Sequence, residues 1–207
     1  MTMRLSFLSS KQREIQRLLN VHSEYQWFLD NDFPVVLPKF YEKLYQESKN
    51  KKDFKTELEK EFNKIYKKED YSKKVKVVKN NWNEIETDFF NILEDCNRKI
   101  RDEYSCYISL YGPEGQFKYP DIIDLRISKQ LDTHRANETI AHELIHLVIL
   151  RKTEKLGLDY KQTEGVVDLF FKKTGLKKLF PDYKLQNIAN HSEKIFKKII
   201  DKNQFMN

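Results

Sequence analysis

Apolar residues recur every three or four positions through most of residues 1–103, which is the spacing of the buried face of a helix. Pro34 and Pro38 interrupt the pattern with a short extended or turn segment, because proline restricts its own backbone and that of the preceding residue. The longest series predicts one helix over residues 71–101. Two shorter series are formed by Phe40, Leu44 and Tyr45, and by Phe54, Leu58, Phe62 and Ile65. We therefore predict a helical N-terminal region.

The pattern changes at about residue 104, where strand-forming residues and turn residues replace the helical spacing. Residues 106–111 read Cys-Tyr-Ile-Ser-Leu-Tyr, and residues 112–115 read Gly-Pro-Glu-Gly, a turn signal. Residues 116–119 and 122–127 are two further candidate strands, the second with alternating apolar and polar side chains. We predict a small antiparallel sheet in this part of the chain.

Helical spacing returns at about residues 134–151, 160–173 and 185–202, with Gly157 and Gly175 marking breaks after the first two. The chain has only five Gly and five Pro residues, which argues against an all-β sandwich. Together the elements predict an α+β fold that is mainly helical.

Composition and charge limit the possible functions. The 207 residues include 38 basic and 32 acidic side chains, and neither half of the chain is strongly one-sided. Short lysine runs stand beside acidic residues on predicted helices, as on solvated helix faces, so we expect no nucleic-acid partner. Cys96 and Cys106 form no CxxC pair, which excludes a zinc ribbon and a disulfide framework.

The apolar stretch near the N-terminus is too short for a signal peptide, and no apolar run approaches the length of a membrane span. We therefore expect a cytoplasmic protein with no membrane partner. A leader already removed from a longer precursor would leave the same pattern.

The chemistry of the chain is concentrated in residues 142–146, which read His-Glu-Leu-Ile-His. Two histidines at i and i+4 lie on the same face of a helix, so both imidazoles can reach one ion, and zinc suits such ligands. Glu143 then stands beside the ion's open position, where it can address a water molecule. The surrounding positions, 140–148, are otherwise apolar, and burying these polar groups without a partner is costly. A pair of hydrogen-bonded core histidines is the alternative.

A third ligand is predicted eighteen residues beyond His146, at Glu164. A reversal at Gly157 would bring Glu164 toward the two histidines and complete a His₂Glu zinc site with its fourth position left to water. Asp168, one helical turn further on, is placed to accept the free ring N–H of a ligating histidine. Gly165 removes bulk beside the ligand and so allows close helix approach. The alternative is an ordinary amphipathic helix with two exposed acids.

The two segments together, His-Glu-Leu-Ile-His at 142–146 and Glu-Gly-Val-Val-Asp at 164–168, resemble the gluzincin group of zinc metallopeptidases, and the compact spacing resembles the minigluzincins. The resemblance covers roughly residues 104–173, about a third of the chain. It implies a zincin-like core and a peptide or protein substrate that adds to a strand preceding the active helix, for which residues 122–127 are the candidate. The implied zinc ligands are His142, His146 and Glu164, with Glu143 as general base and acid and Asp168 as the carboxylate that orients a ligand.

Many gluzincins use a further Tyr, His or Arg to stabilise the oxyanion of the tetrahedral intermediate. The candidates downstream are His191 and Tyr183. His191 falls on a predicted helix that carries Ile195, Phe196 and Ile199, so a plain surface position is the alternative for it.

Three hypotheses follow for function. The first is a zinc peptidase with a core at residues 104–207, preceded by a helical region at residues 1–103 that acts as a pro-segment, a lid or a substrate-recognition part. The second is a zincin-like metal-binding or regulatory interaction domain without peptidase activity. The third is a helical interaction protein with a fortuitous motif. Glu143 and Asp168 favour the first over the second, because a simple metal anchor does not need the base.

Overall fold

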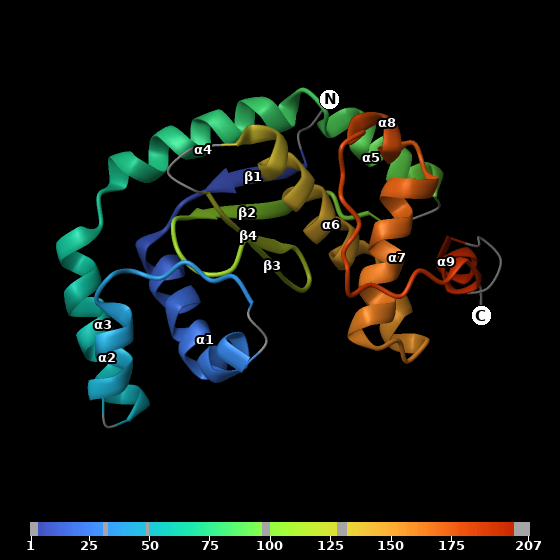
Figure 1. Cartoon of the computed structure of the whole chain (residues 1–207). Helices are drawn as coiled ribbons and strands as arrows, with labels where there is room; N and C mark the ends of the chain where they lie inside the picture. The colour runs from blue at the N-terminus through green and yellow to red at the C-terminus, as the bar shows by residue number, and fades with distance from the viewer. Residues whose placement is uncertain (1–3, 31–32, 49, 97–99, 128–131, 201–207) are drawn as a thin grey trace.

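The computed structural model describes residues 4–30, 33–48, 50–96, 100–127 and 132–200. Within these ranges the chain is mainly helical and includes a small four-stranded sheet (Figure 1). The prediction of a mainly helical α+β fold is therefore confirmed.

The sheet has the strand order β1-β2-β4-β3 and is mixed. β1 (Leu5–Leu8) and β4 (Ile122–Arg126) run parallel to β2 (Tyr104–Ser109), and β3 (Gly115–Lys118) runs antiparallel to β4. The predicted purely antiparallel sheet is thus wrong. Strand-forming residues, turn signals and one alternating segment identified three of the strands, but β1 comes from the other end of the chain, within the region predicted to be helical.

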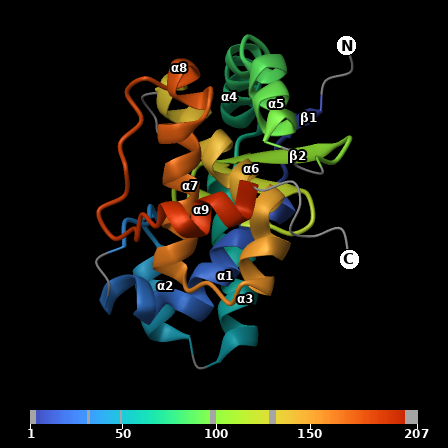
Figure 2. The same ribbon diagram turned by 90° about the vertical axis from the view of Figure 1, so that its right-hand side faces the viewer.

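Helices cover both faces of this sheet (Figure 1). α1 lies on the face that carries Ser109 and Asp124, whereas α4 and α6 pack on the other face. α9 crosses α7, where the rings of Phe170 and Phe196 meet edge to face (Figure 2). The helices are α1 (Lys11–Asp30), α2 (Tyr41–Glu47), α3 (Lys51–Ile65), α4 (Lys68–Asn83), α5 (Glu86–Asp95), α6 (Thr133–Lys155), α7 (Tyr160–Lys173), α8 (Leu176–Leu179) and α9 (Glu193–Ile200).

Two predicted helices differ from the structure. The single helix expected over residues 71–101 is divided into α4 and α5 by a turn at residues 84–85, which places the rings of Trp82 and Phe89 against each other in the core. The helix expected to start at residue 185 starts only at Glu193, because the preceding backbone follows an irregular path over α7.

The core does not divide at residue 103, where the sequence suggested a boundary. α1, α2 and α3 share a separate apolar cluster that includes Leu18, Tyr41 and Phe54. β1, α4 and α5, however, belong to the same core as β2, β4 and the helices from α6 onward. Residues 1–103 therefore supply part of the core that supports the second half of the chain.

No helix in the described part of the chain combines the length and the apolar composition that crossing a membrane requires.

Candidate metal centre

α6 presents the two histidines of the motif at a buried position. The helix begins where the Asp132 side chain accepts a hydrogen bond from the backbone N–H of Arg135 at 3.0 Å, and it runs for 23 residues. His142 and His146 lie one turn apart and are 9% and 4% exposed. Phe117 of β3 stacks on the His146 ring, with 5.0 Å between ring centroids and 12° between planes. Neighbouring elements thus fix the position of the His146 ring.

α7 brings the glutamate to the histidines. Gly157 takes a φ of +63°, which favours glycine, and lets the chain reverse after α6. Asp159 then caps α7: its side chain accepts from the Gln162 N–H, and the Gln162 side chain accepts from the Asp159 N–H. The helix spans Tyr160–Lys173, as predicted, and Glu164 on its second turn is 4% exposed.

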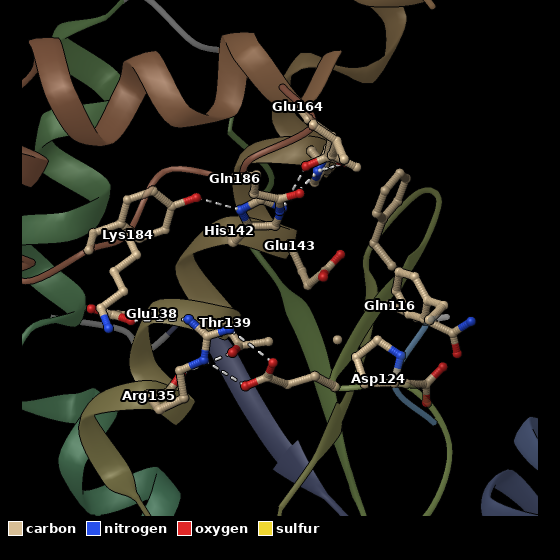
Figure 3. A pocket seen from close by; sticks show the side chains of 18 of the residues that line it. Gln116, Asp124, Arg135, Glu138, Thr139, His142, Glu143, Glu164, Lys184 and Gln186 are labelled. Atoms are coloured by element: carbon tan, nitrogen blue, oxygen red, sulfur yellow. Dashed lines mark hydrogen bonds and ion pairs between the residues drawn. The ribbon is translucent and has the colours of Figure 1, made fainter. Parts of the chain in front are cut away.

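The three predicted ligand atoms converge. The Nε2 atoms of His142 and His146 lie 3.0 Å apart, and the Glu164 carboxylate oxygens lie 3.2 Å from the first and 3.3 Å from the second. Figure 3 shows His142 and Glu164 of this cluster side by side at the border of the pocket. Around a tetrahedral zinc at about 2.0–2.1 Å, neighbouring ligand atoms lie about 3.3–3.4 Å apart. The group can therefore hold a metal ion without large rearrangement.

The charges of the cluster also fit a cation. Burial would raise the pKa of Glu164, but the adjacent imidazoles of His142 and His146 outweigh it and lower the pKa to about 2. Glu164 is thus a buried carboxylate, and its Oε2 atom accepts no hydrogen bond of good geometry, although His142 Nε2 lies 3.2 Å away. A buried acceptor without a donor is costly, and a cation in the cluster would remove that cost.

Glu143 stands next to the cluster without belonging to it. Its side chain is 8% exposed and points into the pocket (Figure 3). Burial raises the pKa of the Glu143 carboxyl to about 7, whereas a nearby cation would lower it. A Cβ at Gly115 would lie 2.4 Å from Glu143 Oε1, so only glycine lets β3 approach the carboxylate this closely.

Asp168 does not contact a ligand directly, which corrects the sequence expectation. The hydroxyl of Tyr183 lies between them, 3.0 Å from Nδ1 of His142 and 2.8 Å from Oδ1 of Asp168. Asp168 is fully buried and accepts further hydrogen bonds from the Gln186 N–H at 2.9 Å and from His191 Nε2 at 2.6 Å. Tyr183 fits there because its ring stacks on Phe171 of α7, with centroids 3.7 Å apart.

Replacing Asp168 with alanine should weaken zinc binding about 10–100-fold, because the chain of hydrogen bonds that ends on His142 would lose its acceptor. The measurement is competition of the purified variant against a zinc chelator of known affinity. An unchanged affinity would make Asp168 a purely structural acid of α7.

His191 is not placed as an oxyanion stabiliser would be. It lies on the irregular segment before α9 rather than on a helix, is not part of the pocket lining, and bonds Asp168. Gly165 explains its position, since a Cβ there would lie 1.9 Å from the carbonyl oxygen of Asn190. The absence of a side chain at Gly165 therefore lets the backbone of residues 190–191 pack closely against α7. The sequence suggested another helix at this position.

A cavity of about 1080 Å³ opens beside the cluster. One wall is β3, a second is residues 182–188, and α1 contributes Arg13, Gln16 and Asn20. The prediction that residues 122–127 form the strand bordering the substrate is wrong: β4 lies inside the sheet, and β3 is the edge strand on the side of the cavity. Its sequence, Gly-Gln-Phe-Lys, has no strong strand alternation, so the pattern favoured its neighbour.

Sequence reasoning also missed a buried cation on α1. Arg17 is 2% exposed and donates to the side chain of Ser109, to the Pro113 carbonyl at 2.5 Å and to the Gln116 side chain at 3.3 Å. It therefore holds the turn that leads into β3. An arginine on a helix is usually exposed, so nothing in the pattern indicated this role.

Comparisons of the chain with protein-family models, with curated proteins and with solved structures give no match. The functional assignment consequently depends on the residues of the site.

Proposed function

We propose that this protein is a zinc-dependent peptidase with a zincin-like core of the gluzincin type. The supporting observation is that His142, His146 and Glu164 turn three buried ligand atoms toward one point at zinc-like spacing. Glu143 lies beside them in an open cleft, outside the ligand set. This combination leaves one ligand position and one carboxylate free for chemistry.

A bound zinc would supply Lewis-acid chemistry, lowering the pKa of a coordinated water to about 7 and polarising a carbonyl. Glu143 would act as the base that takes the proton of the attacking water, and then as the acid that returns it to the leaving amine. Gly115 allows this carboxylate to lie directly against β3. Phe117 on the same strand packs on the His146 ring, so β3 and His146 keep a fixed position relative to each other.

The edge strand offers a place for an extended peptide. The Arg126 N–H donates to the Glu114 carbonyl at 2.8 Å, which makes these two residues a hydrogen-bonded pair. Hydrogen-bonded and non-hydrogen-bonded residue pairs then alternate along β3 and β4. Residues 114, 116 and 118 then face β4, whereas the backbone groups of Gly115 and Phe117 point to the outer edge. An extended substrate could pair there, beside the cluster, and place a peptide bond near Glu143.

The second candidate is a metal-binding or regulatory domain without peptidase activity. It would need the three ligands but not Glu143. A buried carboxylate with a raised pKa beside a metal site is costly to keep without a use. This observation favours the peptidase, and the same argument applies against a fortuitous motif.

The test is the zinc content of the purified full-length protein and of a His146→Ala variant. One zinc per chain in the wild type and a loss of most of it in the variant are expected, because two ligands cannot hold the ion tightly. His134→Ala is the matched control, since His134 lies on the same helix but is half exposed and faces Glu138. A wild-type chain that binds no zinc would end the proposal.

A further inference from the structure

Tyr183 links two buried groups that do not touch each other. Its hydroxyl lies within hydrogen-bond distance of His142 Nδ1 on one side and of Asp168 on the other. An ionised carboxylate only accepts, so the phenol donates its proton to Asp168. The phenol oxygen must then accept from His142, which places a proton on Nδ1 of that ring.

A second contact independently gives the same assignment. The side-chain amide nitrogen of Gln186 lies 3.4 Å from His142 Nε2. An amide N–H can only donate, so Nε2 accepts and carries no proton. The Nε2 atom of His146, which lies 3.0 Å away, is then a second donor to it. Both contacts therefore leave the lone pair of Nε2 on the side of the ring that faces Glu164.

We propose that Tyr183 is the positioning residue of the metal site. Its hydroxyl connects Asp168 to His142 by hydrogen bonds and keeps the His142 ring in the Nδ1–H tautomer, with Nε2 free to bind metal. The inference rests on the metal site of the proposed function but not on peptide hydrolysis. Ligating histidines are usually held in this way by a direct carboxylate or carbonyl; here a phenol from outside the two ligand helices does so.

The phenol is held in place by more than its hydrogen bonds. The Tyr183 ring stacks on Phe171 of α7 with only 5° between their planes. Two residues of the same loop, Gln186 and His191, also bond to Asp168. A phenylalanine at position 183 would consequently keep the stacking and the path of the loop, and lose only the hydroxyl.

The experiment compares the wild type with Tyr183→Phe in two measurements. The tautomer of His142 is read in the zinc-free protein by long-range ¹H–¹⁵N NMR, with its signals assigned from their loss in His142→Ala. We expect Nδ1–H in the wild type and a shift toward Nε2–H in the variant. The second measurement is chelator competition, in which the variant should bind zinc about 10–100-fold more weakly.

Tyr41→Phe is the matched control, because Tyr41 is also buried and its hydroxyl donates to the Leu18 carbonyl at 2.8 Å, in the separate cluster of α1–α3. It should change neither measurement, even if both variants lose similar stability. In a double-mutant cycle, Asp168→Asn should add little to the loss caused by Tyr183→Phe, because both remove the same connection.

Three results would overturn the inference: an Nε2–H tautomer in the wild type, wild-type zinc affinity in Tyr183→Phe, or fully additive losses in the cycle. A protein that holds zinc but cleaves no peptide would contradict the proposed peptidase and leave the role of Tyr183 intact. If the chain binds no zinc, the tautomer measurement still decides whether the phenol controls His142.

Discussion

Replacing Glu143 with glutamine should lower peptide hydrolysis by at least about 10²-fold, the contribution typical of a general base, while zinc content stays at the wild-type level. Glutamine keeps the shape of the side chain but cannot accept a proton from water. The side chain is buried against Gly115, so an isosteric amide is the least disruptive replacement. Zinc content should not change because Glu143 is not among the three converging ligands.

The assay for this variant starts from an unbiased peptide library, because the residues of the site do not define a sequence preference. Glu154→Gln serves as the control, since Glu154 lies on the same helix but is exposed. Equal cleavage by the wild type and Glu143→Gln would show that another group is the base. Zinc binding by the wild type without cleavage of any library member would favour the binding-domain alternative.

Removing residues 1–103 should abolish cooperative folding of the remainder rather than release an active core. The deletion would remove β1 from its place beside β2 and expose the core positions covered by Trp82, Phe89 and Leu93, all of which are fully buried. Truncating a single buried Phe or Trp typically costs about 3–5 kcal/mol, against about 5–15 kcal/mol for the stability of a whole domain. The loss of several such side chains therefore exceeds the available stability.

The deletion is tested by thermal and urea unfolding of residues 104–207 alone and of both fragments produced together. The fragment alone should show no cooperative transition, and the two fragments together should form a folded, zinc-binding complex. A well-folded fragment 104–207 with peptidase activity would instead show that the N-terminal region is a separable pro-segment or lid.

The sequence predicted α7 and the meeting of its glutamate with the histidines because the determinants are local. Asp159 and Gln162 cap the helix, Gly157 permits the reversal, and i, i+4 spacing fixes which side chains share a face. The same reasoning placed Asp168 near His142. It could not place the Tyr183 hydroxyl between them, because Tyr183 lies on a segment without periodicity.

The missed features all depend on pairings between distant segments. β1 joins β2 across about 100 residues, and its four-residue alternation is too short to stand out. The edge position of β3 follows from how β4 pairs on both sides, which strand-forming propensity does not report. The burial of Arg17 likewise depends on carbonyl and side-chain partners more than 90 residues away.

The α1 side of the cleft can change in evolution independently of the metal cluster. All three metal-cluster residues come from α6 and α7, whereas Arg13, Gln16 and Asn20 reach the cavity from α1. Arg17 anchors α1 from within the same stretch of helix by bonds to the sheet. Arg13 also bonds Asp124 of β4 and so helps to fix α1 on the sheet. Substitutions at Gln16 and Asn20 could accordingly change which molecules fit, with this anchor and the metal cluster both left unaltered.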